Sequence, residues 1–593
     1  MRLHLTLALI TVIALVVTLH YEHKHRFTFA EVDAMAQKRA EAKYVPLPST
    51  LPPQLTKLTP QQDGGIFLKE TARLWRRKGL PFQVDFYHPL NSNPQPHISP
   101  AMNVVDRKGS HPLAYSPAFF NFVNMATKPP SALVFEPPLP QNLGYAGFYV
   151  RYPNMGIGSN PASLDGFFSA LGASYFRAIA KDQVYGLSSR GIAINTSMDR
   201  PEEFPNFVEW WLVEPTSNAT ELTLMALLDG PSVSGAYEFR LRPGVVTSVD
   251  IHASLYFRNA IDRLGIAPFS SMYLYGENAA DHFGDNFHPE VHDSDGLLMQ
   301  SSSDEWQWQP LSESDDPRAG SKGYQLQYYT FQQENPKGFG LIQRDRDFQH
   351  YQDLNMLYNV RPSAWVMPSG DWGKGEITLV ERPSNDFNTD NVVMFWHPAD
   401  PIKAGDHRDF SYTIDFYMSD SERPPVAFCK QTLITVPAPL PPVPWTPPVI
   451  PVPPPKPEAG GAPSKPGAKP GARPATNVAS ATPPAPRPFV GPPSPHTGPP
   501  IPIGTTPVQF LIDFAGGGIE DTPANQPPDL HLVYDPPGTY LREKSVEKNG
   551  YDNSWRVTFT IIPYKHYVHT HLKCWLTHNN KPITEIWNYT WRQ

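Results

Sequence analysis

Two groups of acidic residues lie among aromatic residues in the middle of this 593-residue sequence. The first is the segment 292–296 (His-Asp-Ser-Asp-Gly), which contains Asp293, and the second is the segment 385–391, which contains Asp390. Glycoside hydrolysis needs two carboxyl groups, one to protonate the leaving oxygen and one to activate water or attack carbon. Apolar neighbours raise a carboxyl pKa towards the range of a proton donor. The pattern indicates carbohydrate chemistry, although an aspartate in Asp-Ser-Asp-Gly is more often a turn residue.

The aromatic content is high, with 13 Trp, 26 Tyr and 32 Phe. A pyranose ring presents flat C–H faces that pack on aromatic rings, whereas any single aromatic residue more often fills a core. The segments around the acids supply the candidates for substrate binding, which are His292, Trp306, Trp308, Arg361, Trp365, Trp372 and Trp396.

Several other chemistries are not indicated. The sequence contains no G-x-S-x-G, Walker or H-E-x-x-H motif, and no Cys/His cluster with zinc spacing. Asp293 and Asp295 lack the full spacing of a calcium loop, so we expect neither a metal nor a cofactor. A net charge of −8 makes nucleic acid a poor candidate partner. Cys429 and Cys574 both lie in the part of the chain that we expect to be exported, and we expect them to form a disulfide.

Short alternating or aromatic runs, punctuated by Gly, Pro, Asn and Asp, extend from about Pro81 to Met418. They predict a large antiparallel β-sandwich, with a turn between strands at 370–375. A short helix is expected over 28–42. From Val508 to Gln593 strands resume, and their length fits a small immunoglobulin-like sandwich.

The segment Pro437–Pro507 contains 27 of the 70 prolines. Such a composition cannot bury enough apolar surface to fold, so we expect a disordered linker that spaces two domains. Near the amino terminus, Arg2 precedes the apolar stretch Leu5–Leu19, which is typical of an export signal or a short signal anchor. The residues after it lack a clear cleavage site, which favours an uncleaved membrane anchor. The expected divisions are a signal or anchor at 1–27, a sandwich at 28–435, a linker at 436–507 and an immunoglobulin-like domain at 508–593.

Several long motifs lie between Phe29 and Met418. They are Leu171–Arg177 (LGASYFR), Gln183–Gly191 (QVYGLSSRG), Glu203–Pro205, His292–Gly296, Glu334–Gly340 with Arg346–Phe348, Arg361–Trp365 (RPSAW) and Trp372–Gly375. Through these motifs the chain resembles the periplasmic glucan biosynthesis proteins G and D, which are required for osmoregulated periplasmic glucans.

The resemblance implies an all-β protein with a large galactose-mutarotase-like β-sandwich that has a cleft, followed by a small immunoglobulin-like β-sandwich. The family includes inverting endo-β-1,2-glucanases. Carried over by position, Asp390 resembles the general acid and Asp293 the general base, and Tyr358 is a candidate for a hydrogen-bonded relay between water and base. The implied location is the periplasm of a Gram-negative envelope, and the implied partners are β-glucan and glucan-synthesis proteins of the inner membrane.

Two departures from the family pattern keep alternatives open. Phe387 and Asn388 stand where the family usually carries a Glu-Thr pair, and the linker is far longer than in relatives. One hypothesis is a hydrolase that trims the glucan backbone during synthesis. The other is a glucan-binding factor without turnover that presents nascent glucan to other proteins. A carbohydrate epimerase is a third, suggested by the sandwich type alone.

Overall fold

The computed structural model describes residues 27–49, 51–93, 97–160, 162–279, 287–312, 326–384, 386–419, 423–435, 507–537, 539–563 and 569–592. The expected signal or anchor at 1–27 and the linker at 436–507 therefore lie almost entirely outside the described residues. Within the described ranges, no helix has both the length and the apolar character needed to cross a membrane.

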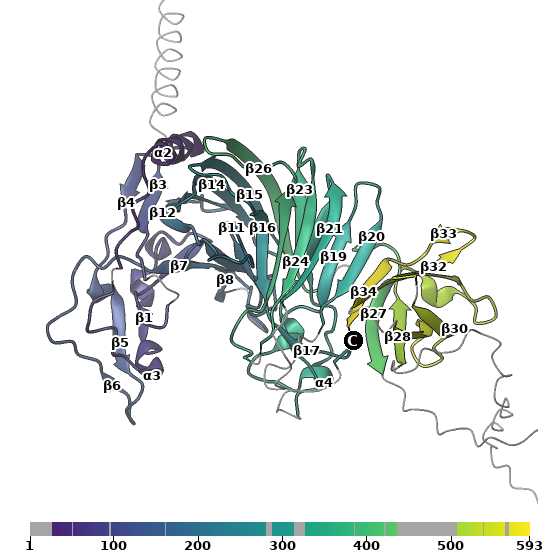
Figure 1. Cartoon of the computed structure of the whole chain (residues 1–593). Coiled ribbons are helices and arrows are strands. Elements are labelled where there is room, and N and C mark those ends of the chain that lie inside the picture. The colour runs from purple at the N-terminus through teal and green to yellow at the C-terminus, as the bar shows by residue number, and fades with distance from the viewer. Residues whose placement is uncertain are drawn as a thin grey trace, which may run out of the picture. The chain divides into compact units, whose positions relative to one another are not determined.

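The prediction of an all-β sandwich is confirmed (Figure 1). In the described part of the chain, one sheet has 15 strands. In spatial order these are β29 (Asp529–Asp535), β32 (His569–His578), β34 (Ile586–Arg592), β20 (Trp306–Pro310), β19 (Gly296–Gln300), β22 (Gly338–Ile342), β23 (Ser363–Ser369), β26 (His407–Tyr417), β15 (Val246–Phe257), β14 (Val233–Arg242), β13 (Leu222–Asp229), β12 (Asn206–Val213), β3 (Ala101–Asp106) and β4 (Gly109–Pro112), with β33 (Lys581–Pro582) beside β32.

A second sheet has 10 strands among the described residues. In order these are β2 (Gln83–Tyr87), β7 (Gly147–Pro153), β8 (Leu164–Leu171), β9 (Tyr175–Ala178), β10 (Ser188–Arg190), β16 (Leu264–Ser271), β25 (Val392–Pro398), β24 (Lys374–Glu381) and β21 (Gln327–Glu334), with β11 (Ile192–Ile194) beside β16. Smaller sheets are β1 (Ile66–Leu68), β5 (Phe120–Asn124) and β6 (Ser131–Ala132), and the pair β17 (Tyr273–Tyr275) and β18 (Val291–His292).

Aromatic side chains from the two large sheets meet in the core. Phe168 and Phe176 of the 10-stranded sheet contact Phe239 of the 15-stranded sheet, with ring centroids 6.4 and 5.4 Å apart. Such pairs prefer tilted or edge-to-face geometry, and the apolar burial behind them dominates the stability of a sandwich. The aromatic, alternating sequence runs are therefore the inward faces of packed sheets.

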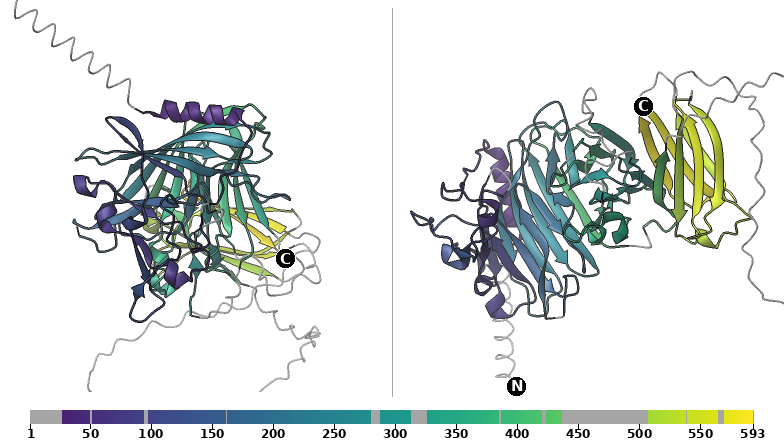
Figure 2. Two further views of the ribbon diagram at one scale, coloured as in Figure 1. Left: turned by 90° about the vertical axis from the view of Figure 1, so that its left-hand side faces the viewer. Right: turned by 90° about the horizontal axis from the view of Figure 1, so that it is seen from below.

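Helices are few in the described residues and lie outside the sheets: α2 (Phe29–Glu41), α3 (Pro60–Asp63) and α4 (Phe348–Tyr351). The predicted helix at 28–42 is confirmed as α2, which begins with a capping box in which the Thr28 backbone N–H donates to Glu31 at 2.7 Å. Its Val32 and Ala36 are buried against the outer face of the 15-stranded sheet (Figures 1 and 2).

A four-stranded sheet near the carboxyl terminus consists of β27 (Phe428–Thr435), β28 (Val508–Ala515), β31 (Trp555–Ile562) and β30 (Tyr540–Lys548). It packs through a common apolar core on strands β32 and β34, and β34 in turn pairs with β20 of the large sandwich. The expected alternation of Trp555, Val557, Phe559 and Ile561 places all four side chains in this core.

The strands on either side of the proline-rich segment are direct neighbours. β27 and β28 are antiparallel, and Thr435 is the partner of Gln509. The segment between them therefore connects the two strands of one hairpin. The domain division at 435 and 508 stays a prediction, but this pairing places β27 in the same sheet as β28.

This pairing leads to a prediction about the proline-rich segment. Replacing 437–505 by a five-residue Gly/Ser turn should leave the fold intact and stabilise it by about 2 kcal/mol, because shorter loops cost less closure entropy. Thermal unfolding of the purified protein checks this expectation. Loss of the cooperative transition would show that the segment contributes contacts of its own.

The predicted disulfide is wrong. Cys429 on β27 and Cys574 on β32 are free thiols buried in the same apolar core. Burial raises the pKa of both thiols well above the usual value, so neither is readily ionised. The Cys429 thiol instead lies 3.5 Å from the Thr432 hydroxyl of its own strand. The two cysteines behave as small core residues.

Candidate functional site

The base candidate Asp293 directly follows strand β18 and is almost fully buried. Its backbone N–H donates to the Met272 carbonyl at 2.8 Å, and its carboxylate accepts a hydrogen bond from the Arg361 guanidinium. Burial raises the pKa of Asp293, Arg361 opposes the rise, and the nearby charge of Asp390 adds to it. The two predicted carboxyl groups are therefore close enough to interact.

The acid candidate Asp390 lies in the turn before β25. Its side chain is exposed. The protein around it nevertheless displaces enough water to raise its pKa, and the charges of Arg177, Arg190 and Arg361 oppose this rise. A carboxyl with a raised pKa is suited to holding a proton for donation. Asp390 and Asp293 thus combine an accessible acid with a buried, arginine-bound partner.

Asn391 fixes the Asp390 turn next to β17. Its side-chain oxygen accepts from the Tyr273 N–H at 2.8 Å, its amide donates to the Tyr273 carbonyl at 2.7 Å, and its backbone N–H donates to Ser271 at 3.0 Å. Since residue 272 also holds Asp293, one stretch of backbone positions both carboxyl groups. Asn391 was not among the predicted site residues, although an amide directly after the acid of a motif is a signal that could have indicated it.

Two arginines near Asp390 were also missed, although both lie in quoted motifs. Arg177 is on β9, and Arg190 on β10 donates to Glu202 at 2.6 Å and to Ser270 at 2.9 Å while lying over the Tyr175 ring. A guanidinium presents a rigid fork of donors that suits oxygen-rich ligands. Their positive charge favours the ionised form of Asp390.

Arg361 contacts both the base candidate Asp293 and the relay candidate Tyr358. It donates to Asp293 and to the Met356 carbonyl, and its guanidinium lies over the Tyr358 ring at 4.4 Å from the centroid. Gly186 leaves room for it, because a Cβ at that position would lie only 3.0 Å from Arg361 side-chain carbons. The relay candidate Tyr358 is buried, and this burial raises the pKa of its hydroxyl. The charge of Arg361 opposes the rise, and the charge of Asp293 adds to it.

His292 is fully buried behind Asp293. Its Nε2 lies 2.8 Å from Glu290, and its Nδ1 lies 3.0 Å from the Gln343 side-chain oxygen and 3.2 Å from Asp295. Burial lowers its pKa, but Asp295 and Glu290 outweigh that effect and raise it to about 10. Its predicted substrate contact stays untested, and both ring nitrogens already have protein partners.

The five tryptophans proposed for sugar binding are core residues in this structure. Each exposes less than a tenth of its surface, with 8% for Trp306, 3% for Trp308, 2% for Trp365, 7% for Trp372 and 0% for Trp396. Trp306 and Trp365 stack on each other, and the Arg344 guanidinium covers the Trp308 ring at 3.6 Å. The prediction that they bind substrate gains no support from this packing. An aromatic ring that does reach solvent is that of Phe387, three residues before Asp390, which is 48% exposed.

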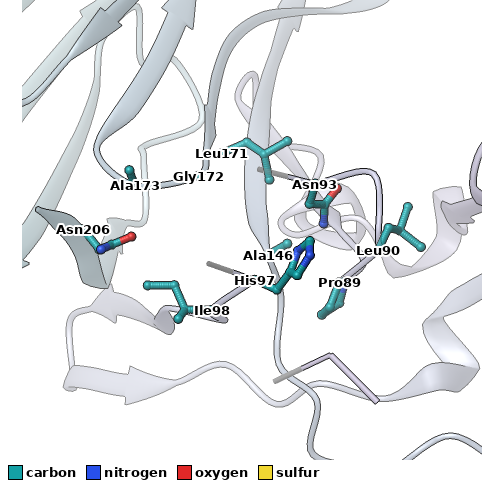
Figure 3. A pocket seen from close by; sticks show the side chains of 10 residues that line it. All are labelled: Pro89, Leu90, Asn93, His97, Ile98, Ala146, Leu171, Gly172, Ala173 and Asn206. Atoms are coloured by element: carbon teal, nitrogen blue, oxygen red, sulfur yellow. The ribbon is translucent and has the colours of Figure 1, made fainter. Parts of the chain in front are cut away.

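A small cavity beside the 171–177 motif is a poor substrate site. Figure 3 shows that it lies between Pro89, Leu90, Asn93, His97 and Ile98 on one side and residues Leu171 to Ala173 on the other. Its volume of about 20 Å³ has room for about one water molecule and none for a sugar ring.

An all-β sandwich that holds two interacting carboxyl groups beside arginines has the groups expected of a carbohydrate-active protein. Comparison with known proteins agrees with this class and makes it specific. The family model "Periplasmic glucan biosynthesis protein, MdoG" matches residues 27–439 and 496–591, and the chain belongs to this family.

Curated relatives give the same result. The chain is 40% identical over 406 residues to a glucans biosynthesis protein G of Ralstonia nicotianae, covering 68% of this chain and 76% of the relative. It is 39% identical over 413 residues to the glucans biosynthesis protein G of Pseudomonas aeruginosa, covering 69% and 74%. It is 38% identical over 392 residues to a probable glucans biosynthesis protein D of Shewanella oneidensis, covering 66% and 67%.

Proposed function

We propose that this protein acts in the biosynthesis of periplasmic glucans as an inverting endo-β-1,2-glucanase. The observation that carries the proposal is the pairing of Asp390, exposed with a raised pKa, with Asp293, buried and bound to Arg361. Asp390 protonates the glycosidic oxygen, and Asp293 accepts a proton from the attacking water, through Tyr358 where the water lies beyond its direct reach. The relatives are named for glucan biosynthesis, and for this reason we propose a glucan as the substrate. The β-1,2 linkage is what the resemblance to the family implies.

The arginines have a separate part in this mechanism. Arg361 fixes the orientation of Asp293 and favours its ionised form, which the base must have when water arrives. Arg177 and Arg190 favour the ionised form of Asp390 and so stabilise the carboxylate that remains after proton donation. We place the protein in the periplasm, with β-glucan as its ligand and with glucan-synthesis proteins of the inner membrane as partners.

Stereochemistry is the first test. We expect linear β-1,2-glucan to give the α-anomer at the newly formed reducing end, because a base that activates water from the opposite face inverts the anomeric carbon. Proton NMR within the first minutes, before mutarotation, reads the product anomer. Net retention would require a nucleophile in direct reach of the carbon and would remove Asp293 from the base role.

A second function is favoured by one observation. The exposed Phe387 is three residues from Asp390 and offers an apolar surface for a sugar face without any catalytic group. On this alternative, the protein binds nascent glucan and presents it to other synthesis proteins. Prolonged incubation with linear β-1,2-glucan distinguishes the two functions, since saturable binding with no new reducing ends would favour presentation.

A further inference from the structure

A cavity of about 800 Å³ lies between the large sandwich and the carboxyl-terminal strands. One wall is formed by residues of the large sandwich between Tyr273 and His350, and the other by the segment Phe428–Gln431 and residues 513–552. Carboxylates lie on both walls, and they are Glu277, Glu290, Asp295, Asp345, Asp347, Asp513, Glu520 and Asp552. The cavity is separate from the Asp293–Asp390 pair, neither of which lines it.

Three side chains at one corner of this cavity converge on a common point. The ligand atoms of Glu290, Asp345 and His350 all lie within 4.8 Å of one another. Glu290 is buried, Asp345 is 19% exposed and His350 is 49% exposed, so the point is open to the cavity on one side. A mixed carboxylate and imidazole set is typical of divalent transition-metal sites.

The groups behind these three residues hold them in place. The His292 ring lies 2.8 Å from the Glu290 carboxylate, and the Glu290 backbone N–H donates to the His350 carbonyl at 2.9 Å. The Asp345 backbone N–H donates to Asp295 at 2.7 Å, and the Tyr351 hydroxyl donates to the Asp345 carbonyl at 3.2 Å. Metal ligands are usually oriented by such outer hydrogen bonds, and here that support is present.

The charges around the corner favour a cation. Three further carboxyl groups, those of Glu277, Asp295 and Asp347, line the same wall of the cavity. The two arginines on this wall are engaged elsewhere: Arg344 pairs with Glu585, and Arg346 donates to the carbonyls of Asn359 and Arg361. His292 differs from them, because it lies against the Glu290 carboxylate as well as against Asp295.

A sugar is a poorer occupant than a cation. The Trp308 ring in this cavity is covered by the Arg344 guanidinium, so its face cannot stack on a pyranose. On the opposite wall, Asp513 pairs with Arg556 and Asp552 with Lys430. Two of the three carboxylates on the opposite wall are therefore ion-paired, and the third, Glu520, accepts a hydrogen bond from the Gly516 backbone N–H.

We propose that Glu290, Asp345 and His350 bind one divalent transition-metal ion, Mn²⁺ or Zn²⁺, at the wall of this cavity. Three protein ligands leave positions for water from the cavity. Ca²⁺ fits less well, because it takes oxygen ligands and seldom an imidazole. No motif spacing indicates this site, since its ligands come from two segments 55 residues apart.

The test measures metal binding by the full chain after removal of metals with a chelator. Electron paramagnetic resonance of free Mn²⁺ gives the number of ions bound, and competition with Zn²⁺ and Ca²⁺ gives the selectivity. We expect one Mn²⁺ per chain at this site, displaced by Zn²⁺ far more readily than by Ca²⁺. His350→Ala and Glu290→Gln should each weaken binding at least tenfold.

Matched variants distinguish metal binding at this site from metal binding by other histidines of the chain. Asp552→Asn lies on the opposite wall of the same cavity and should bind Mn²⁺ like the parent protein. His20, His23 and His25 near the amino terminus can bind metal independently, so the readout is the ion lost in His350→Ala relative to the parent. His350 is half-exposed, so this variant should fold even if Glu290→Gln does not. No saturable binding of Mn²⁺ or Zn²⁺, or equal binding by His350→Ala and the parent, would overturn the proposal.

Discussion

Replacing Asp390 by asparagine should lower the rate of hydrolysis of linear β-1,2-glucan by about 10² to 10⁴, because the proton donor is lost. Binding of glucan should change little, since asparagine keeps the size and hydrogen-bonding capacity of the side chain. Reducing-end assays give the rate, and isothermal titration with the inactive variant gives the affinity. The fold should persist, because Asp390 is exposed and the Asn391 contacts remain.

Asp400→Asn is the matched control. Asp400 is an exposed aspartate just beyond the other end of β25, and its change should leave the rate within about twofold. Turnover by Asp390→Asn at the rate of this control would remove Asp390 from the mechanism. A loss of glucan binding of the same size as the loss of rate would instead identify Asp390 as a binding residue.

The pH dependence follows from the same assignment. Asp390 must hold its proton, so the rate should fall as pH rises through its pKa, which lies above the usual aspartate value. Asp293 must be ionised, so the rate should also fall as pH decreases through its own raised pKa. In Asp390→Asn the residual rate should keep the acidic limb and lose the alkaline one.

Replacing Arg344 by methionine should destabilise the protein by about 3–5 kcal/mol, because it leaves a buried charge without its partner. Arg344 forms two hydrogen bonds with Glu585, at 2.7 and 2.9 Å, and both side chains are almost fully buried. The pair connects the large sandwich to the residue directly before β34. Urea unfolding followed by tryptophan fluorescence measures the change, and Trp308 beside Arg344 reports on it locally.

A surface pair provides the comparison. Lys337 and Asp304 form an exposed ion pair, and Lys337→Met should cost less than about 1 kcal/mol. The double variant Arg344→Met, Glu585→Leu should recover part of the loss, because it removes both charges together. An effect of Arg344→Met no larger than that of Lys337→Met would show that Glu585 finds another partner.

The strands and the buried face of each could be predicted from the sequence, because the alternation of apolar and polar residues is visible within one short segment. The run from Trp555 to Ile561 illustrates this, since all its alternate residues face the core. Pairing between distant strands has no such local signal. The pairing of β27 with β28 across the proline-rich segment, and that of β20 with β34, therefore appeared only in the structure.

The site was predictable in part. The motifs indicated Asp293 and Asp390, whereas Asn391, Arg177 and Arg190 act through contacts with segments more than 60 residues away or through charge alone. The prediction that the tryptophans bind substrate gains no support from the structure, because a large aromatic ring beside an acid in sequence has the same pattern whether it faces a ligand or a core. Burial distinguishes the two, and burial is a property of the whole fold.

The hairpin of β27 and β28 has a consequence for how the chain can be divided. A single cut anywhere between Val436 and Thr506 would separate the polypeptide into two fragments without separating any paired strands. The β27 edge on the first fragment would still pair with β28 on the second, while β20 and β34 would still pair alongside. All strand pairings among the described residues are therefore retained across such a cut, and we expect the two fragments to reassemble.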